Sequence, residues 1–247
     1  MANTSGNGTR RLSKAELRRR RRRRKKIRKY AILAGLAIIL ILFLMLVIKL
    51  ISWIFSSSDD GLVKKVDDIK VTQKLLSVND FTRPGTELKK VEKIVIHYTG
   101  VEINSTAIAQ RDRYEARKDS HSDTDTRESM HFIIGAEGEI VQCIPINEAA
   151  YASKGDNGRA ISIEFCNTGT DGTMSSDTYV SLVKLVAYLC DEFDLTEKNV
   201  ERHYDITGAA CPLYFAKNPD SWTQFREDVA KAIKGKSFDT SNPIVKQ

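Results

Sequence analysis

Two histidines and a cysteine are the residues of this sequence whose types could hold a metal ion. His97 follows a run of β-branched residues, and His203 and Cys211 lie eight positions apart in a segment with little apolar periodicity. Two imidazoles and one thiolate leave one corner of a tetrahedron free, which is typical of a catalytic rather than a structural zinc site. Spacing alone leaves the assignment open, because a His and a Cys at this separation also occur by chance.

The surrounding sequence predicts which elements position these residues. Residues 93–98 have the β-branched density of a buried strand, with His97 near its end. Turn-forming Asp205 and Gly208 make residues 203–211 loop-like. We therefore expect a strand end and a loop to bring the three side chains together, as loops on a rigid scaffold often display ligands.

One carboxylate is a candidate for acid–base chemistry beside such a metal. Residues 161–166 alternate between apolar and polar side chains, as in a strand that buries one face. Glu164 is thereby turned away from the apolar layer. A solvated Glu on an exposed strand face fits the same pattern, so the residues alone leave both interpretations open.

The remaining pattern predicts an α/β fold. Residues 130–134 and 140–144 have the pattern of a β-hairpin, and Ser105 can cap a helix. Apolar residues recur at helical spacing over residues 179–193, and Pro219 opens a last helix. Strands interleaved with amphipathic helices predict a mixed central β-sheet with flanking helices.

Charge is distributed unevenly along the 247 residues, whose net charge is +7. The first 50 residues hold 15 of the 39 Lys and Arg residues and one of the 32 Asp and Glu residues, so the remainder carries −7. The excess forms one block, Arg18 to Lys29, which we expect to stay disordered because its charges repel. Membrane orientation explains this block without a nucleic-acid partner, and RNA or anionic-lipid binding is the alternative.

An apolar segment follows the basic block. Residues 31–48 contain no charged side chain, and apolar character resumes after Lys49 as far as Phe55, which predicts a single transmembrane helix. A cleaved signal peptide is the competing interpretation, but its apolar core would be shorter and a small-residue cleavage site would follow. The basic flank predicts a cytoplasmic N-terminus in the cell membrane, an extracytoplasmic domain, and Trp53 and Phe55 as outer interfacial anchors.

These features divide the chain into five regions. The spacer after Phe55 is small and polar, so it cannot order itself, and apolar residues return at about Val71. The predicted regions are a basic cytoplasmic tail (1–30), a transmembrane helix (31–55), an extracytoplasmic linker (56–70), one catalytic domain (71–235) and a polar, loose tail (236–247).

The other histidines and cysteines fit ordinary structural roles. His131 lies within a predicted strand, as a core residue or a partner of a metal ligand, and His121 lies in the polar loop 118–128. We expect the cysteines other than Cys211 to be packed thiols, with a disulfide between Cys143 and Cys166 as the alternative.

Four segments occur in order between about residue 71 and residue 233. They are IVIHYTG (94–100), MHFIIGAEGEIVQCIP (130–145), ISIEFC (161–166) and RHYDITGAACP (202–212). Together they resemble the successive motifs of zinc-dependent N-acetylmuramoyl-L-alanine amidases, the family related to phage lysozyme-type amidases and peptidoglycan recognition proteins.

The resemblance implies a fold, a cofactor and a reaction. It implies the fold of that family, a Zn²⁺ ion held by His97, His203 and Cys211, and peptidoglycan as the partner. The reaction would be hydrolysis of the amide that joins the lactyl group of N-acetylmuramic acid to L-alanine. Some members use a Glu on the matching strand, which makes Glu164 the expected general base.

Two positions depart from the family pattern. Many members have a Lys two residues before the cysteine ligand, credited with steadying the oxyanion, where this chain has Ala209. Others have a catalytic Tyr before the His of the second motif, where this chain has Met130. Losing one oxyanion donor typically costs about two to three powers of ten in rate. Three candidates could supply the missing donor, although the sequence does not position them: Tyr98, Lys154 and Thr207.

Two functions therefore compete. The leading hypothesis is a membrane-anchored amidase that remodels the cell's own wall, because an anchor limits its reach to nearby peptidoglycan. The alternative is a catalytically weak or inactive module that senses muropeptides, motivated by Ala209 and Met130.

Overall fold

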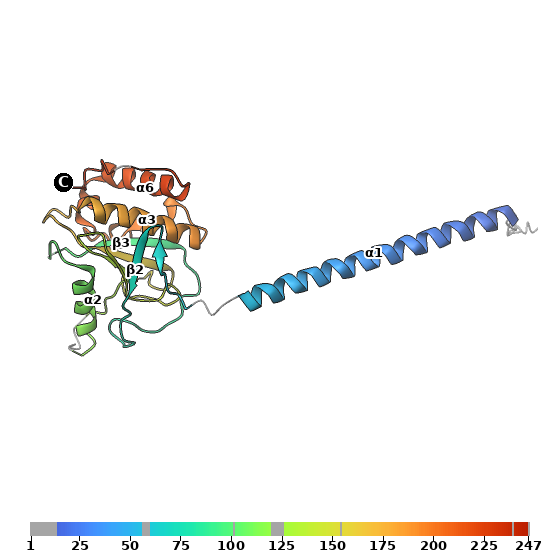
Figure 1. Cartoon of the computed structure of the whole chain (residues 1–247), viewed down its shortest axis with the longest axis horizontal. Helices are drawn as coiled ribbons and strands as arrows, with labels where there is room; N and C mark the ends of the chain where they lie inside the picture. Colours follow the sequence, from blue (N-terminus) through green and yellow to red (C-terminus); the bar gives the residue numbers. More distant parts are fainter. Residues whose placement is uncertain are drawn as a thin grey trace, which may run out of the picture. The chain divides into compact units, whose positions relative to one another are not determined.

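The computed structural model describes residues 14–55, 60–100, 102–119, 126–153, 155–238 and 240–246. The chain divides into two compact units, Met1–Ser58 and Asp59–Gln247 (Figure 1). Each unit is described by itself.

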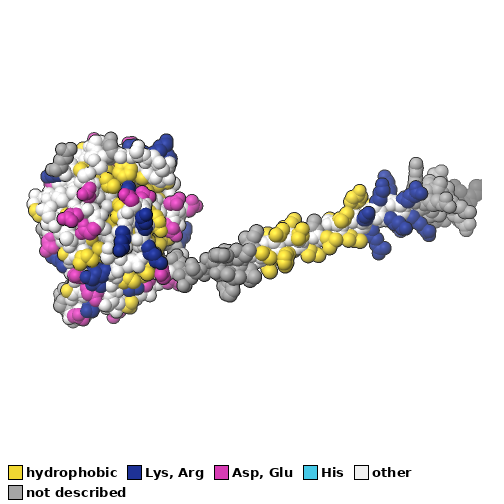
Figure 2. Space-filling model, in the orientation of Figure 1, with side chains coloured by type: hydrophobic (Ala, Val, Ile, Leu, Met, Phe, Trp, Pro, Cys, Tyr) yellow, Lys and Arg dark blue, Asp and Glu magenta, His cyan; other side chains and the backbone are white. Residues whose placement is uncertain are grey.

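The first unit contains α1 (Lys14–Phe55), one helix of 42 residues. Figure 2 shows Lys and Arg side chains on one part of α1 and hydrophobic side chains along the next. Within the described residues, the stretch Arg21–Val47 is long and apolar enough to cross a membrane, a test that a signal sequence also passes. The side chains of Trp53 and Phe55 lie outside the described residues.

The described part of the basic block is helical, so the expected disorder from Arg18 to Lys29 is wrong. Arg and Lys have good intrinsic helix propensity. Extending a helix that already exists also costs far less than nucleating a new one. The apolar helix that follows therefore continues into the basic block despite the repulsion between its charges.

Within the described residues of the second unit, seven strands form one sheet in the order β1-β2-β5-β4-β6-β3-β7. The strands are β1 (Lys65–Val66), β2 (Ile69–Gln73), β3 (Lys93–Tyr98), β4 (Phe132–Ile134), β5 (Ile140–Gln142), β6 (Ala160–Phe165) and β7 (Val200–Arg202). The pairs β1–β2 and β4–β5 are antiparallel, and the others are parallel. The predicted mixed sheet is confirmed.

Helices cover both faces of this sheet (Figure 1). α3 (Ser176–Glu192) and α6 (Pro219–Ile233) pack on one face, and α2 (Ala107–Ala116) packs on the other. The 3-10 turn η1 (Glu197–Asn199) precedes β7, and α4 (His203–Thr207) and α5 (Leu213–Lys217) lie between β7 and α6. The larger apolar cluster lies under α3 and α6, and a smaller one lies under α2. The predicted flanking helices are thereby confirmed.

The cap of α2 differs from the prediction by one residue. Thr106, not Ser105, is the N-cap, and its hydroxyl accepts a hydrogen bond from the Ala109 amide at 3.2 Å. Both residue types cap helices. The sequence therefore located the start of the helix but not the residue that caps it.

The second unit begins earlier than residue 71. Val63 and Val66 are 2% and 1% exposed and belong to the larger cluster, and β1 lies within the stretch assigned to the linker 56–70. Two valines in a polar segment give little signal in the sequence, because distant residues supply the apolar surface that buries them. The predicted linker was therefore too long.

The segment after residue 235 also packs onto the unit. Ile244 is fully buried, and Val245 forms a β-bridge with Met174. The amide of Asn242 donates to the Tyr179 hydroxyl at 3.1 Å. The expected loose tail 236–247 is wrong for residues 240–246, which one isoleucine and one asparagine fix in place.

Candidate metal centre

His97 lies near the carboxyl end of β3, between β6 and β7. Its side chain is 3% exposed, and burial, followed by the nearby His203, lowers its pKa to about 3. The ring is therefore neutral at physiological pH and has a lone pair for a metal. Its Nε2 lies 3.4 Å from the Ser153 hydroxyl oxygen, and a hydrogen bond there leaves Nδ1 to act as the ligand.

His203 is the first residue of α4, so the segment predicted as a loop begins as a short helix. Arg202 precedes it and forms an ion pair with Asp205 at 2.6 Å, and Gly208 ends α4 with a left-handed φ of 75°. Burial lowers the pKa of His203, so its ring also favours the neutral form. The ring centroids of His203 and His97 lie 4.5 Å apart.

A backbone hydrogen bond brings Cys211 back toward His203. The Tyr204 amide donates to the Cys211 carbonyl at 2.8 Å, and Cys211 Sγ lies 3.9 Å from His97 Nδ1. Burial raises the pKa of the Cys211 thiol to about 12, opposed by a hydrogen bond from the Tyr98 backbone. A thiol in such a setting ionises when a cation compensates its charge.

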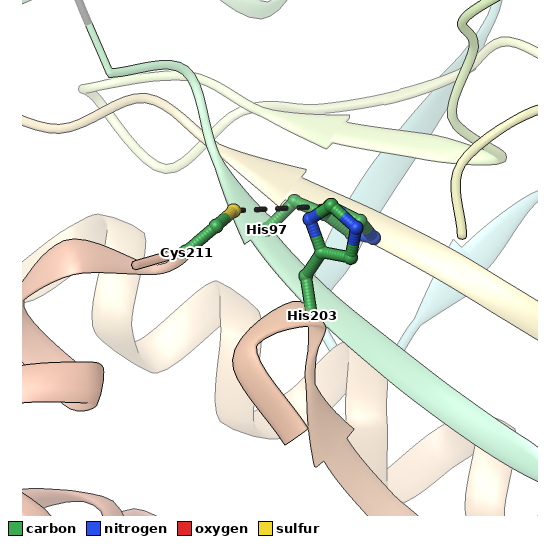
Figure 3. A group of neighbouring side chains, drawn as sticks. All are labelled: His97, His203 and Cys211. Carbon is green, nitrogen blue, oxygen red and sulfur yellow. Dashed lines mark hydrogen bonds between the residues drawn. The ribbon is translucent and has the colours of Figure 1, made fainter. Parts of the chain in front are cut away.

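The three side chains turn toward a common point (Figure 3). One ligand atom from each residue lies within 4.8 Å of the others. In a tetrahedral zinc site, bonds of about 2.0–2.3 Å would put the ligand atoms roughly 3.3–3.6 Å apart. Small side-chain rotations would close the observed group to that spacing. The donor set and its geometry therefore fit a zinc ion.

Glu164 lies beside His97 in the parallel pairing of β6 with β3, so both side chains leave the same face of the sheet. It is 5% exposed, which differs from a solvated strand Glu. Burial raises its pKa to about 8, opposed by a hydrogen bond that Tyr114 donates at 3.0 Å. Its charge also raises the pKa of the Cys211 thiol, to a smaller extent than burial does.

A cleft of about 690 Å³ opens beside the cluster. His203, Thr207 and Ser153 contribute to its wall. The Arg127 guanidinium lies 5.4 Å from the centroid of the Tyr151 ring. The lining residues are Thr126, Arg127, Glu128, Tyr151, Ala152, Ser153, Asn157, His203, Thr207 and Ala209. A substrate in this cleft would therefore reach one of the candidate ligands.

The other histidines stay outside the cluster, as far as the structure describes them. His131 is fully buried; its Nδ1 accepts from the Ser162 amide at 3.0 Å, and its Nε2 lies 2.9 Å from the Glu148 carbonyl. Both ring nitrogens are thus occupied, as in a core histidine. His121 lies outside the described residues.

All four cysteines are free, so the alternative of a disulfide between Cys143 and Cys166 is wrong. Both thiols are buried in the cluster under α2, and burial raises the pKa of each. They are packed thiols, which confirms the prediction from the sequence. Cys190, on α3, is buried in the larger cluster.

Neither departure from the family pattern supplies a donor. Ala209 lines the cleft, and Met130 is 2% exposed in the cluster under α2. Thr207 also lines the cleft, but its hydroxyl donates to a backbone carbonyl of α4 at 3.0 Å. Burial raises the pKa of Tyr98, which follows His97 on β3. Lys154 lies outside the described residues.

Sequence reasoning missed the neighbours of the candidate residues. Ser153 lies in a turn, and no spacing rule connects it to His97. Tyr114 is 50 positions from Glu164, and no spacing rule connects the two residues. The face that it shares with Ala107 and Arg111 on α2 indicates that it packs against the sheet, but not which residue it meets.

Comparisons with known proteins identify the family of this chain. The family model of N-acetylmuramoyl-L-alanine amidases matches residues 87–213. The N-acetylmuramoyl-L-alanine amidase CwlL of Bacillus licheniformis is 30% identical over 190 residues, or 72% of this chain and 52% of that protein. The amidase BlyA of Bacillus subtilis (strain 168) is 29% identical and covers 70% and 50%. The chain thus spans about half the length of the curated relatives it matches.

Solved structures have the same fold. A mutant endolysin from Bacillus subtilis superposes with a TM-score of 0.53 at 26% identity and covers 65% of this chain and 99% of that one. The PlyG catalytic domain superposes with a TM-score of 0.55 at 21% identity and covers 71% and 99%. Because the matched residues 87–213 include the three candidate ligands and Glu164, and make up half of the sequence, the chain belongs to the N-acetylmuramoyl-L-alanine amidase family.

Proposed function

We propose that this chain is a zinc-dependent amidase that hydrolyses the lactyl–L-alanine amide of peptidoglycan in cell-wall remodelling. The observation that carries the proposal is the convergence of His97, His203 and Cys211 beside a cleft. The names of the curated relatives support the same reaction.

His97, His203 and Cys211 would hold the zinc ion. A zinc ion bound there would polarise the amide carbonyl and lower the pKa of water toward neutrality. The lowered pKa values of both histidines keep their rings neutral and ready to bind. The Cys211 thiol must lose a proton, so metal binding by this site would be coupled to pH.

Glu164 would handle the proton of the reaction. Its carboxylate would accept a proton from the attacking water and return it to the amine that leaves. Burial alone favours the protonated carboxyl, and positive charge near His97 would favour the ionised form that a base requires. Glu164 is therefore suited to act once the site is loaded.

We also propose that α1 anchors the chain in the cell membrane, with the N-terminus cytoplasmic and the second unit outside. The support is the apolar stretch Arg21–Val47 and the basic residues on its N-terminal side. The mass of the protein recovered from membranes tests this proposal. Loss of the first 50 or so residues would identify a cleaved signal sequence instead.

A weak or inactive sensor of muropeptides is the second candidate, because Ala209 and Met130 offer no oxyanion donor. Both candidates use the same cleft and the same metal. They differ in turnover, since a sensor retains its ligand without cleaving it. One experiment can therefore separate them.

The experiment incubates the full-length chain in detergent with zinc and peptidoglycan and measures new L-alanine amino termini. Release is expected from the wild type. Glu164→Gln is the matched control, because it should retain zinc and lose turnover. If the wild type binds peptidoglycan but produces no new L-alanine amino termini, the chain is the sensor.

A further inference from the structure

The two carboxylate oxygens of Glu164 differ, because one accepts a hydrogen bond and the other has no hydrogen-bond partner within the residues that the structure describes. Tyr114 donates its hydroxyl to Glu164 Oε2 at 3.0 Å. Oε1 is buried and has no hydrogen-bond partner among the described residues. A buried carboxylate oxygen without a partner is costly and requires an explanation, and a catalytic role is one that fits a carboxylate beside a candidate metal centre.

Tyr114 reaches Glu164 from a different element. It lies on the face of α2 that packs against the sheet and is 7% exposed. Met130 lies in the same apolar cluster under α2 and brings no hydroxyl to it. Tyr114 therefore supplies the phenol that contacts Glu164 within the described part of the chain.

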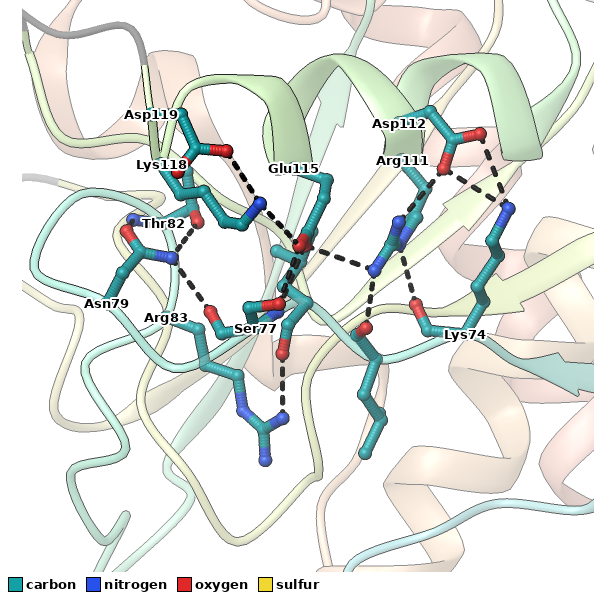
Figure 4. A network of polar contacts seen from close by, with 12 residues as sticks. Lys74, Ser77, Asn79, Thr82, Arg83, Arg111, Asp112, Glu115, Lys118 and Asp119 are labelled. Carbon is teal, nitrogen blue, oxygen red and sulfur yellow. Dashed lines mark hydrogen bonds and ion pairs between the residues drawn. The ribbon is translucent and has the colours of Figure 1, made fainter.

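A polar network fixes α2 in place (Figure 4). Arg111 donates to the carbonyls of Lys74 and Leu75 at 2.9 and 2.5 Å, and to Glu115 at 3.1 Å. Glu115 in turn accepts from the amide and hydroxyl of Ser77. Because these bonds flank Tyr114 along the helix, they set the position of its hydroxyl.

We propose that Tyr114 is a positioning residue for the amidase reaction, which holds Glu164 so that Oε1 is presented to the nucleophilic water. The inference rests on the proposed function. As the water O–H bond breaks, Oε1 takes the proton and the water oxygen bonds to the carbonyl carbon. As the C–N bond breaks, Oε1 gives the proton to the amine nitrogen, and the carbonyl carbon is left as the carboxyl group of the lactyl product. The Tyr114 proton stays on its own oxygen throughout, so no other reactant is required.

The test is a double-mutant cycle in the full-length chain, with kcat expressed per bound zinc. Tyr114→Phe removes only the hydroxyl, and we expect kcat to fall about 10- to 100-fold with KM unchanged, as for a misplaced catalytic group. In Glu164→Gln, adding Tyr114→Phe should have no further effect on the residual rate, since the residue through which it acts is gone.

Tyr179→Phe is the matched control. Tyr179 is a fully buried tyrosine of α3 that donates to Asp228 of α6 at 2.8 Å, on the other side of the sheet from Glu164. The Tyr179→Phe variant should be less stable than the wild type and should retain the wild-type kcat per bound zinc. A merely structural role for Tyr114 would give Tyr114→Phe the same behaviour.

A second measurement needs no activity. In metal-free protein, the unfolding free energies of Tyr114→Phe and Glu164→Met, which removes the acceptor, should be non-additive, by an amount that corresponds to a factor of about 2 to 150 in the equilibrium constant. Each of three results would overturn the inference. They are additive free energies of unfolding, a wild-type kcat in Tyr114→Phe, and an equal loss of rate when Tyr114→Phe is introduced into the wild type and into Glu164→Gln. A wild type without any amide hydrolysis would overturn the proposed function instead, and the unfolding cycle would still report on the hydrogen bond.

Discussion

Ser153 illustrates how much a single residue beside the cluster contributes. Its side chain is 1% exposed, and its amide is held by the Asn157 side chain at 2.6 Å. The hydroxyl is therefore fixed against His97 Nε2. Partners of this kind set the orientation and tautomer of a metal-binding histidine.

We expect Ser153→Ala to weaken zinc binding by about 10- to 100-fold, because His97 would lose the partner that orients it. Competition against a chelator measures the affinity. Ser181→Ala is the matched control, since this buried serine of α3 donates to the Gly138 carbonyl. Equal zinc affinities in the two variants would remove Ser153 from this role.

We expect Cys211→Ser to lose zinc and to melt at a lower temperature, because a site without one ligand loses both metal affinity and the folding energy linked to it. Elemental analysis and thermal unfolding measure the two effects. Cys190→Ser, at a buried thiol of α3, should retain its zinc. An undiminished zinc content in Cys211→Ser would exclude Cys211 as a ligand.

Glu164 also predicts how stability depends on pH in the metal-free protein. Its pKa rises from 4.5 to about 8 on folding, so the folded state holds the proton more tightly. Its contribution is therefore fully present below the unfolded pKa and is lost as pH rises through about 8. The amide side chain that Glu164→Gln introduces cannot ionise. In urea unfolding, the stability of Glu164→Gln should therefore rise relative to that of the wild type between about pH 5 and pH 9. A constant difference would contradict the burial argument.

The candidate metal ligands could be named from the sequence, but the residues that contact them and Glu164 could not. His97, His203 and Cys211 belong to ordered motifs and to residue types with few other uses together. Ser153 and Tyr114 acquire their roles only when the chain folds, because a hydroxyl can pair with many groups and tertiary structure selects one.

At the scale of elements, strands and long helices could be predicted because their apolar periodicity is local. β3, β6 and α3 follow that rule. α4 could not be predicted, since five residues give no period, and its start and end depend on Asp205 and Gly208. β1 was missed for the same reason, because two residues carry no alternation.

The attachment of α2 predicts a large effect of one buried arginine. Arg111→Met should lower the free energy of unfolding by about 1–3 kcal/mol, because two backbone carbonyls and Glu115 lose a charged donor. Urea unfolding measures the change. Arg113→Met is the control, as its side chain is 50% exposed and pairs with Glu102 in solvent, which contributes at most about 1 kcal/mol. Equal losses in both variants would contradict the proposed anchoring.

At the scale of the whole molecule, the extent of the second unit has a measurable consequence. A chain that begins at residue 71 lacks β1, Val63 and Val66, whereas one that begins at residue 59 retains them. Since burying a valine contributes about 1.5–3 kcal/mol, the shorter chain should be less stable by roughly 3 kcal/mol or more. The thermal melting midpoints of the two chains test this difference. Equal midpoints would support the boundary at residue 71 that the sequence predicts.

The length of α1 has a further consequence for the proposed anchor. A helix of 42 residues is about 63 Å long, roughly twice the hydrocarbon thickness of a bilayer. The basic turns nearest the lipid, around Lys25 to Lys29, would neutralise headgroup charge. Those from Arg21 to Arg24 would begin farther out, where salt screens the membrane surface within about 8 Å. Much of the arginine charge would therefore face the cytosol and be available to soluble polyanions.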